Sequence, residues 1–100
     1  MDILTQYMNQ IYTLCKRHNV SELFVFGSIL KESFNEQSDI DFVVDFSNIS
    51  LEEYADNYFD LKFSLEELLR RKVDLLENRA IRNPYLRESI DSTKQLVYGA

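Results

Sequence analysis

The chain has 100 residues, of which 45% are hydrophobic, and 17 acidic against 11 basic side chains give a formal net charge of −6. This length is typical of one compact domain, so we expect residues 1–100 to form a single unit. The acidic charge counts against direct binding of nucleic acid, which usually needs a basic surface. No apolar run approaches the roughly 20 residues of a membrane-spanning helix. A single cysteine indicates a cytoplasmic protein without disulfides.

The first half of the chain predicts one helix and two strands. Apolar residues at i, i+3 and i+4 spacing over residues 3–15 predict an unbroken amphipathic helix, and Asn19 is a suitable left-handed stop after it. A short apolar run at residues 23–26 predicts a buried strand that ends at Gly27. Alternation over residues 40–46 predicts a second strand, with one face buried.

A capping box predicts where the longest helix begins. Ser50 is followed three residues later by Glu53, and this pattern places a helix over residues 51 to about 70. We expect its apolar side to include Leu51, Tyr54, Ala55, Tyr58, Leu61, Leu65, Leu68 and Leu69.

The last third of the chain predicts two more strands around a helix. Residues 73–77 read as a strand, Asn83 and Pro84 begin a helix through about Ser92, and residues 95–98 favour an edge strand over a continued helix. This order of elements predicts an α/β (α+β) domain, a small mixed β-sheet flanked by helices.

Several conspicuous side chains have structural explanations. Cys15 lies on the apolar side of the first helix and is expected to be a buried thiol. His18 is expected to interact with the helix end rather than to catalyse a reaction, and Arg70-Arg71-Lys72 to mark another helix end, with a nucleic-acid patch as the alternative. The aromatic residues of the long helix belong mostly to the core, although an exposed remainder could form a partner surface: Tyr54, Tyr58 and Phe59.

Gly27-Ser28 is a candidate phosphate site. The pair follows a predicted strand directly and precedes residues 29–32, which could form a short helical turn. Backbone N–H groups at such a helix start can bind an anion. The alternative is an ordinary strand-ending turn, since many turns use these residues.

Three aspartates form a candidate metal site. Asp39 and Asp41 occupy alternate strand positions, about 6.6 Å apart on one face, although aspartate is disfavoured in strands. From that separation two carboxylates can converge on divalent cations. Asp74 begins another predicted strand and could join them if the strands pair. Solvent-facing strand residues are the alternative. Asp45 lies about 13 Å further along from Asp41 and is left out.

Taken together, Gly27-Ser28, ten residues, Asp39-x-Asp41 and the distal Asp74 resemble the signature of the nucleotidyltransferase superfamily related to DNA polymerase beta. The size and element order are similar to those of minimal nucleotidyltransferases over nearly the full chain. The resemblance implies that Gly27 and Ser28 hold a triphosphate while Asp39 and Asp41 bind magnesium ions. It also implies that Asp74 completes this site and assists the incoming hydroxyl.

One departure from the family pattern lies close to the proposed phosphate site. Family members commonly have Arg-Gly a few residues after Gly-Ser, whereas this chain has Lys31-Glu32. Lys31 keeps a positive charge for nucleotide binding but lacks the bidentate fork of arginine. Glu32 beside it is expected to weaken that binding.

The resemblance also implies an activity, a cofactor and a partner. The expected enzyme is a magnesium-dependent nucleotidyltransferase that moves a nucleoside monophosphate, AMP from ATP, to a hydroxyl. Minimal members are typically paired with a HEPN-domain partner, and some act as antitoxins that adenylylate a tyrosine of that toxin. Homo-oligomers remain an open alternative for assembly. Two other functions stay open: a non-catalytic module that neutralises or regulates a partner, and a structural domain whose acids only solvate a strand.

Overall fold

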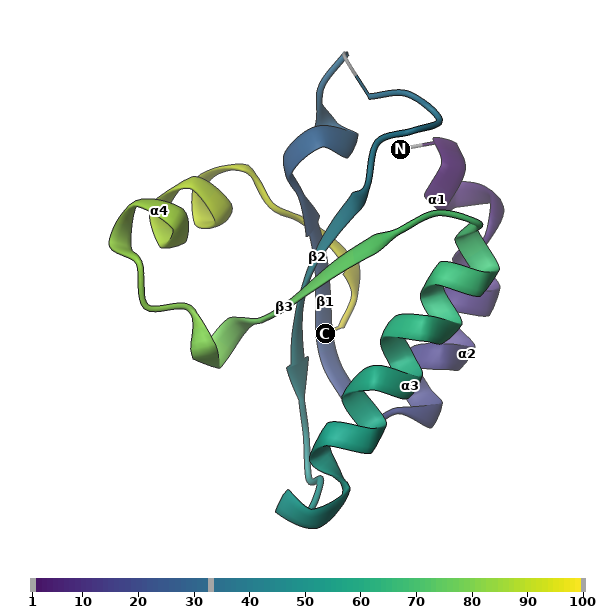
Figure 1. Ribbon diagram of the computed structural model, residues 1–100, viewed down its shortest axis with the longest axis vertical. Coiled ribbons are helices and arrows are strands. Elements are labelled where there is room, and N and C mark those ends of the chain that lie inside the picture. The colour runs from purple at the N-terminus through teal and green to yellow at the C-terminus, as the bar shows by residue number, and fades with distance from the viewer. Residues whose placement is uncertain (1, 33, 100) are drawn as a thin grey trace.

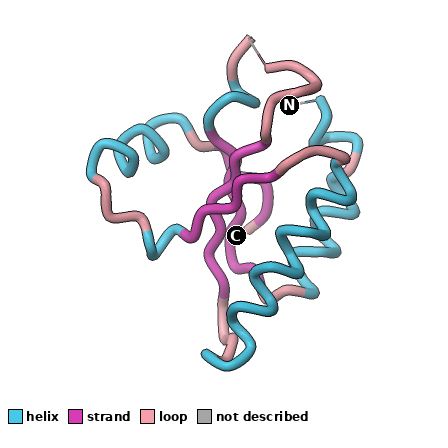
Figure 2. The backbone as a smooth tube through the Cα atoms, in the orientation of Figure 1, coloured by secondary structure: helices cyan, strands magenta, loops and turns pink. Residues whose placement is uncertain are grey.

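The computed structural model of the protein describes residues 2–32 and 34–99. Over these residues the chain forms one mixed sheet of four strands in the order β3-β2-β1-β4. Helices α2 and α3 cover one face of the sheet and α4 lies on the other (Figures 1 and 2). The expected fold class, a small mixed sheet flanked by helices, is therefore confirmed. The strands are β1 (Val20–Phe26), β2 (Ile40–Phe46), β3 (Val73–Glu77) and β4 (Gln95–Tyr98).

The first helix is broken, contrary to the sequence prediction. It consists of α1 (Asp2–Gln6) and α2 (Met8–Arg17), separated at Tyr7, whose backbone angles are φ −113° and ψ 15°. The Tyr7 N–H donates to the carbonyl oxygen of Leu4 at 3.0 Å, so the chain tightens by one residue at this turn. Leu4 and Ile11 are both fully buried on either side of the break. The apolar stripe therefore continues across the break at Tyr7, so the spacing of apolar residues does not reveal the break.

His18 joins the end of α2 to the middle of α3. Its ring is buried, with Nδ1 2.7 Å from the Leu14 carbonyl oxygen and Nε2 2.6 Å from a carboxylate oxygen of Asp60. The Asn57 side-chain amide donates to the His18 carbonyl oxygen at 2.7 Å. Asn19 follows in the left-handed conformation, with φ 57°, as its position predicts. His18 is thus engaged at the helix end and also in a tertiary link to α3 through Asp60, and it has no contact with Asp39, Asp41 or Asp74 among the described residues.

Helix α3 (Leu51–Leu69) begins at the predicted serine cap. Ser50 Oγ accepts from the Glu53 N–H at 3.3 Å, and the helix ends where Arg70 adopts a left-handed conformation. Leu65 is fully buried, but Leu51 is 91% exposed, so its predicted place on the apolar side is wrong. The reason is tertiary: α3 begins past the end of the sheet in Figure 1, and only from Tyr54, which packs against Phe46, does the helix reach the sheet.

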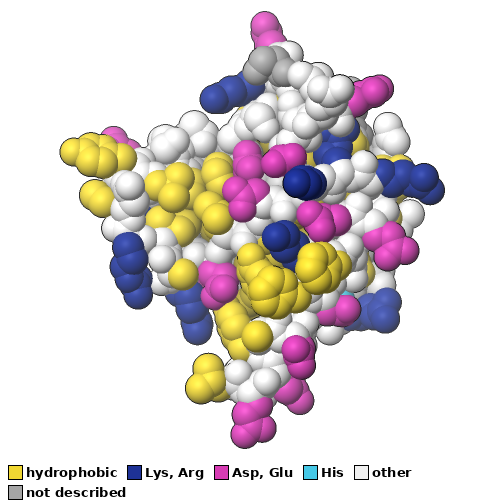
Figure 3. All heavy atoms as spheres, viewed as in Figure 1, with side chains coloured by type: hydrophobic (Ala, Val, Ile, Leu, Met, Phe, Trp, Pro, Cys, Tyr) yellow, Lys and Arg dark blue, Asp and Glu magenta, His cyan; other side chains and the backbone are white. Residues whose placement is uncertain are grey.

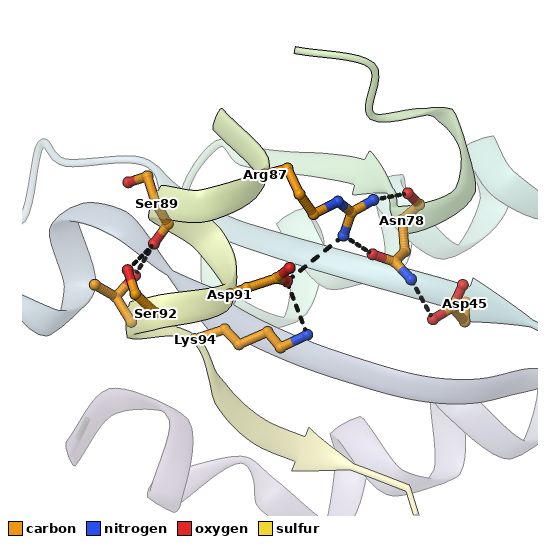
Figure 4. A network of polar contacts seen from close by, with 8 residues as sticks. Asp45, Asn78, Arg87, Ser89, Asp91, Ser92 and Lys94 are labelled. Carbon is orange, nitrogen blue, oxygen red and sulfur yellow. Dashed lines mark hydrogen bonds and ion pairs between the residues drawn. The ribbon is translucent and has the colours of Figure 1, made fainter. Parts of the chain in front are cut away.

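Helix α4 (Pro84–Thr93) is anchored to the second face of the sheet by polar contacts (Figure 4). Arg87 donates to the side-chain and backbone oxygens of Asn78 at 2.5 and 2.6 Å, and Asn78 donates to an Asp45 carboxylate oxygen at 3.0 Å. Asn78 opens η2 (Asn78–Ala80), a 3₁₀ turn that the sequence analysis did not anticipate. Arg87 and Lys94 also flank Asp91. Asp45 therefore has a structural partner.

The edge of the sheet is formed by β4, as the sequence favoured. β4 pairs antiparallel with β1, where Phe24 lies opposite Leu96. β1 itself starts at Val20, three residues earlier than the apolar run indicated, because Val20 pairs with Phe46 of β2. Among the described residues, the helices are too short or too polar for any of them to cross a membrane.

We predict that two leucines of α3 differ sharply in their contribution to stability. Leu65→Ala should lower the free energy of unfolding by about 2–5 kcal/mol, because it empties a fully buried site. Leu51→Ala should change it by less than about 0.5 kcal/mol, because that side chain is exposed. Urea unfolding followed by circular dichroism measures both. Equal losses would show that the Leu51 side chain packs against the core.

Candidate active site

Strand register brings the predicted acidic residues to one end of the sheet. In the antiparallel pair β1–β2, Phe26 lies opposite Asp41, and in the parallel pair β2–β3, Asp41 lies opposite Asp74. The turn η1 (Gly27–Leu30) leaves β1 at this same end. Figure 3 shows acidic side chains gathered over this part of the molecule. The Gly-Ser turn and two of the three aspartates therefore meet although they are far apart in sequence.

Gly27 lies directly against the Asp41 carboxylate. Its φ is +73°, and a Cβ atom at this position would lie 2.3 Å from Asp41 Oδ2. Such a distance is incompatible with any side chain unless Asp41 moves. Glycine is thus favoured here both for its backbone conformation and for the space that the carboxylate occupies.

Ser28 binds the acidic pair through its backbone and its side chain. Its N–H donates to the Asp41 carboxylate, and its hydroxyl donates to the Asp39 carbonyl oxygen at 3.0 Å. The helical turn predicted over residues 29–32 lies instead at Gly27–Leu30, because Lys31 already has extended angles of φ −110° and ψ 152°. The helical turn therefore begins at the Gly-Ser pair itself, two residues earlier than predicted.

The aspartates and Lys31 form one electrostatic group around Asp41. Partial burial raises the pKa of the Asp41 carboxyl above its usual 3.8, and the negative charges of Asp74 and Asp39 raise it further. The Ser28 N–H and the positive charge of Lys31 act in the opposite direction. Asp39 and Asp74 are exposed, so Asp41 is the inner carboxylate of the group.

The donor set fits a hard divalent cation that takes part of its coordination from a substrate. Within residues 2–32 and 34–99, no three His, Cys, Asp or Glu side chains are placed as a ready-made cage for a metal ion. Magnesium seldom uses such cages, because it usually binds one or two carboxylates together with substrate phosphates and water. Asp41 and Asp74 offer oxygen ligands on paired residues, and a cation would relieve the repulsion that raises the Asp41 pKa.

The side chains that the sequence analysis set aside stay outside this group. Cys15 is fully buried on α2, and burial raises the pKa of its thiol to about 12, which makes it a poor nucleophile. Asp45 is bonded to Asn78. Arg71, expected only to mark a helix end, donates through its guanidinium to the carbonyl oxygens of Asn35 and Ser38 in the segment before β2. Nothing local marks this role, because the partners lie 33 and 36 residues away in sequence.

Comparison with known proteins identifies the family. The profile described as polymerase beta, nucleotidyltransferase, matches residues 9–100. The chain belongs to this family. It is a nucleotidyltransferase, and enzymes of this kind generally use a divalent metal ion. The resemblance read from the Gly-Ser and Asp-x-Asp motifs is thereby confirmed.

Relatives of this nucleotidyltransferase match most of its length. Two proteins of Methanocaldococcus jannaschii, each named "putative protein adenylyltransferase", are 34% and 36% identical to it. The alignments cover 82% and 85% of this chain and 79% and 82% of the relatives. A solved structure described as a "putative minimal nucleotidyltransferase" has a TM-score of 0.76 at 30% identity, covering 94% of this chain and 92% of its own.

A more distant structure shares the fold. A crystal structure of a toxin–antitoxin with AMP-PNP has a TM-score of 0.71 at 21% identity, and the match covers 93% of this chain and 73% of that one. The nucleotidyltransferase fold therefore extends over the sheet and its helices.

We predict that Gly27→Ala disrupts the site. The new methyl group meets the Asp41 carboxylate and the positive φ is strained, so stability should fall by about 1–3 kcal/mol. ATP affinity measured by calorimetry should fall with it. Gly99→Ala, at a second glycine with positive φ near Ser21 and Glu22, is the matched control and should leave ATP affinity unchanged. Unaltered ATP affinity in the Gly27 variant would mean that this contact does not shape the site.

The raised pKa of Asp41 predicts how stability depends on pH. Because the folded pKa lies above the unfolded one, ionisation of Asp41 opposes folding, and this effect sets in as pH rises above 3.8 through the folded value. Without divalent cations, Asp41→Asn should therefore be more stable than wild type at pH 7, and the difference should disappear below pH 3.8. Thermal unfolding across this range tests it, with the exposed Asp56→Asn as control. A variant less stable than wild type at pH 7 contradicts the prediction.

Proposed function

We propose that this nucleotidyltransferase transfers AMP from ATP to a hydroxyl group of a partner protein, with magnesium as its metal ion. The observation that carries the proposal is the contact of Gly27 with Asp41, at the point where Asp41 and Asp74 lie on paired strand residues. This contact puts the half-buried Gly-Ser turn next to oxygen ligands for a cation. The names of the Methanocaldococcus jannaschii relatives support AMP as the transferred group and a protein as the acceptor.

Each residue has a distinct role in the proposal. Gly27 and Ser28 hold the triphosphate beside the acidic group. Lys31 adds a positive charge, which also acts to lower the pKa of Asp41. Asp39 and Asp41, with Asp74 beside them, would hold magnesium. When bound, the metal neutralises phosphate charge and stabilises the charge that develops during transfer.

Asp74 is the residue that we assign to the incoming hydroxyl. The hydroxyl proton passes to its carboxylate while the hydroxyl oxygen bonds to the α-phosphorus of ATP, and the bond from that phosphorus to the bridging oxygen breaks to release pyrophosphate. Asp74 is exposed, so a hydroxyl on a large acceptor can reach it. This exposure favours a macromolecular acceptor over a small enclosed one.

The partner that we propose is a HEPN-domain protein, with a tyrosine hydroxyl as acceptor. Support comes from a structure with the same fold, described as a tri-AMPylated Shewanella oneidensis HEPN toxin in complex with an MNT antitoxin. It has a TM-score of 0.66 at 20% identity, and the match covers 96% of this chain. On this proposal the enzyme is the antitoxin, and it silences its partner by attaching AMP.

The test is ATP binding and transfer with and without magnesium. The chain has a formal net charge of −6, and in the proposed site three carboxylates face the nucleotide. We therefore expect ATP to bind much more tightly in the presence of magnesium than in the presence of a chelator. Lys31→Ala should weaken it by about 1–2 kcal/mol, the scale of one charge-assisted hydrogen bond. Lys16→Ala, an exposed lysine of α2, is the control.

Transfer itself is tested with the combined Asp39→Asn and Asp41→Asn variant. It should stay folded and lose transfer of labelled AMP to a co-expressed HEPN-domain protein. Transfer at the wild-type rate would show that the site is assigned wrongly. Equal ATP affinity in magnesium and in chelator would remove the metal from the mechanism. Partner binding without any nucleotide binding would identify a non-catalytic module instead.

A further inference from the structure

Arg71 fastens the segment before β2 to the turn between α3 and β3. Its Nη1 donates to the carbonyl oxygens of Asn35 and Ser38, each at 3.0 Å. The guanidinium carbon also lies 4.8 Å from the centre of the Phe34 ring, within the range of a cation–π contact. One side chain thus contacts three residues of this segment, which continues directly into Asp39.

The backbone around Asp39 is held by three hydrogen bonds from two turns. Arg71 binds the carbonyl oxygen of Ser38, Ser28 binds that of Asp39 at 3.0 Å, and the N–H of Ile40 donates to the Lys72 carbonyl oxygen at 3.1 Å. Residues 38, 39 and 40 are therefore each fixed by a separate hydrogen bond. Two of the three partners are consecutive residues of the α3–β3 turn, so this turn and the Gly-Ser turn together place the Asp39 backbone.

The environment of Arg71 points to a geometric role. The side chain is half-buried, and its Nε atom is buried without a hydrogen-bond partner among the described residues. A buried donor without a partner is a cost to folding. An apolar side chain would avoid this cost but could not hold two carbonyl oxygens. Exposed Asp39 and the neighbouring Asp41 also repel each other, so a segment held less firmly would carry Asp39 away from the site.

We propose that Arg71 is a positioning residue, which sets the place of Asp39 relative to Asp41 and Asp74 by holding Asn35 and Ser38. In this role it determines how tightly the acidic group binds a divalent cation and, with it, a nucleotide. The identity of that ligand rests on the proposed function. The hydrogen bonds of Arg71 to the segment do not depend on the proposed function.

The experiment compares Arg71→Met and Arg71→Lys with Arg70→Gln. Arg70 is exposed, and its guanidinium has no hydrogen bond or ion pair among the described residues, so Arg70→Gln removes the same charge one residue away. Each variant is studied by backbone amide NMR, by urea unfolding, by calorimetric titration with Mn²⁺ alone, and by titration with ATP and magnesium.

Arg71→Met should shift the amide resonances of residues 34–41 and weaken Mn²⁺ binding by about tenfold or more, the usual effect of losing a group that orients a metal ligand. Arg71→Lys should recover part of that affinity, because its ammonium group can still donate to the carbonyl oxygens. Arg70→Gln should bind Mn²⁺ as the wild type does. If Arg71→Met does not fold, the comparison of Arg71→Lys with Arg70→Gln decides the question in the same way.

Three results would overturn the inference. The amide resonances of the segment could stay in place, in which case Arg71 does not hold it. Mn²⁺ affinity could stay unchanged while unfolding becomes easier, which is the result of a purely structural role. The wild type could bind no Mn²⁺ at all. If the wild type binds Mn²⁺ but not ATP with magnesium, the proposed nucleotide chemistry fails while the Mn²⁺ and NMR results still decide the role of Arg71.

Discussion

The contact between the Gly27 backbone and the Asp41 carboxylate is the constraint on which the site depends. Because Phe26 pairs with Asp41, the chain that leaves β1 must turn directly across this carboxylate. The space there is too small for a Cβ atom, and the turn needs a positive φ. Glycine meets both demands without a shift of Asp41 or strain in the backbone. Ser28 then follows in a position where its N–H reaches Asp41 and its hydroxyl reaches the backbone of Asp39.

This packing concentrates negative charge at the site that we propose for an anionic nucleotide. The parallel register of β2 and β3 adds Asp74 beside Asp41, and Lys31 is the positive side chain whose charge reaches Asp41. Repulsion among the carboxylates destabilises the folded state at this end of the sheet. A divalent cation offsets it and attracts phosphate at the same time, which is why metal chemistry suits an acidic nucleotidyltransferase.

Two aspartates on one face of β2 have opposite roles. Asp41 is partly buried beside other acids, whereas Asp45 accepts from Asn78, which in turn binds Arg87 of α4 (Figure 4). This network attaches α4 over the far half of the sheet face and leaves the half around Asp41 and Asp74 to the site. One part of this face is covered by α4 and the other carries the candidate site, because the polar contacts of α4 lie at Asn78 and, through it, at Asp45.

The sequence by itself determined the features that rest on neighbouring residues. The strand over residues 40–46 and the Ser50 cap follow from local spacing, because caps, periodicity and strand alternation involve residues a few positions apart. The link between the Gly-Ser pair and the Asp-x-Asp motif came from the resemblance to a known family. Only the tertiary structure decided the rest. The pairing of Asp41 with Asp74 depends on which strands lie side by side in the sheet. The exposure of Leu51 depends on where the sheet ends, and the role of Arg71 depends on a segment more than thirty residues away in sequence. Such contacts leave no local pattern, since their energy comes from groups that only folding brings together.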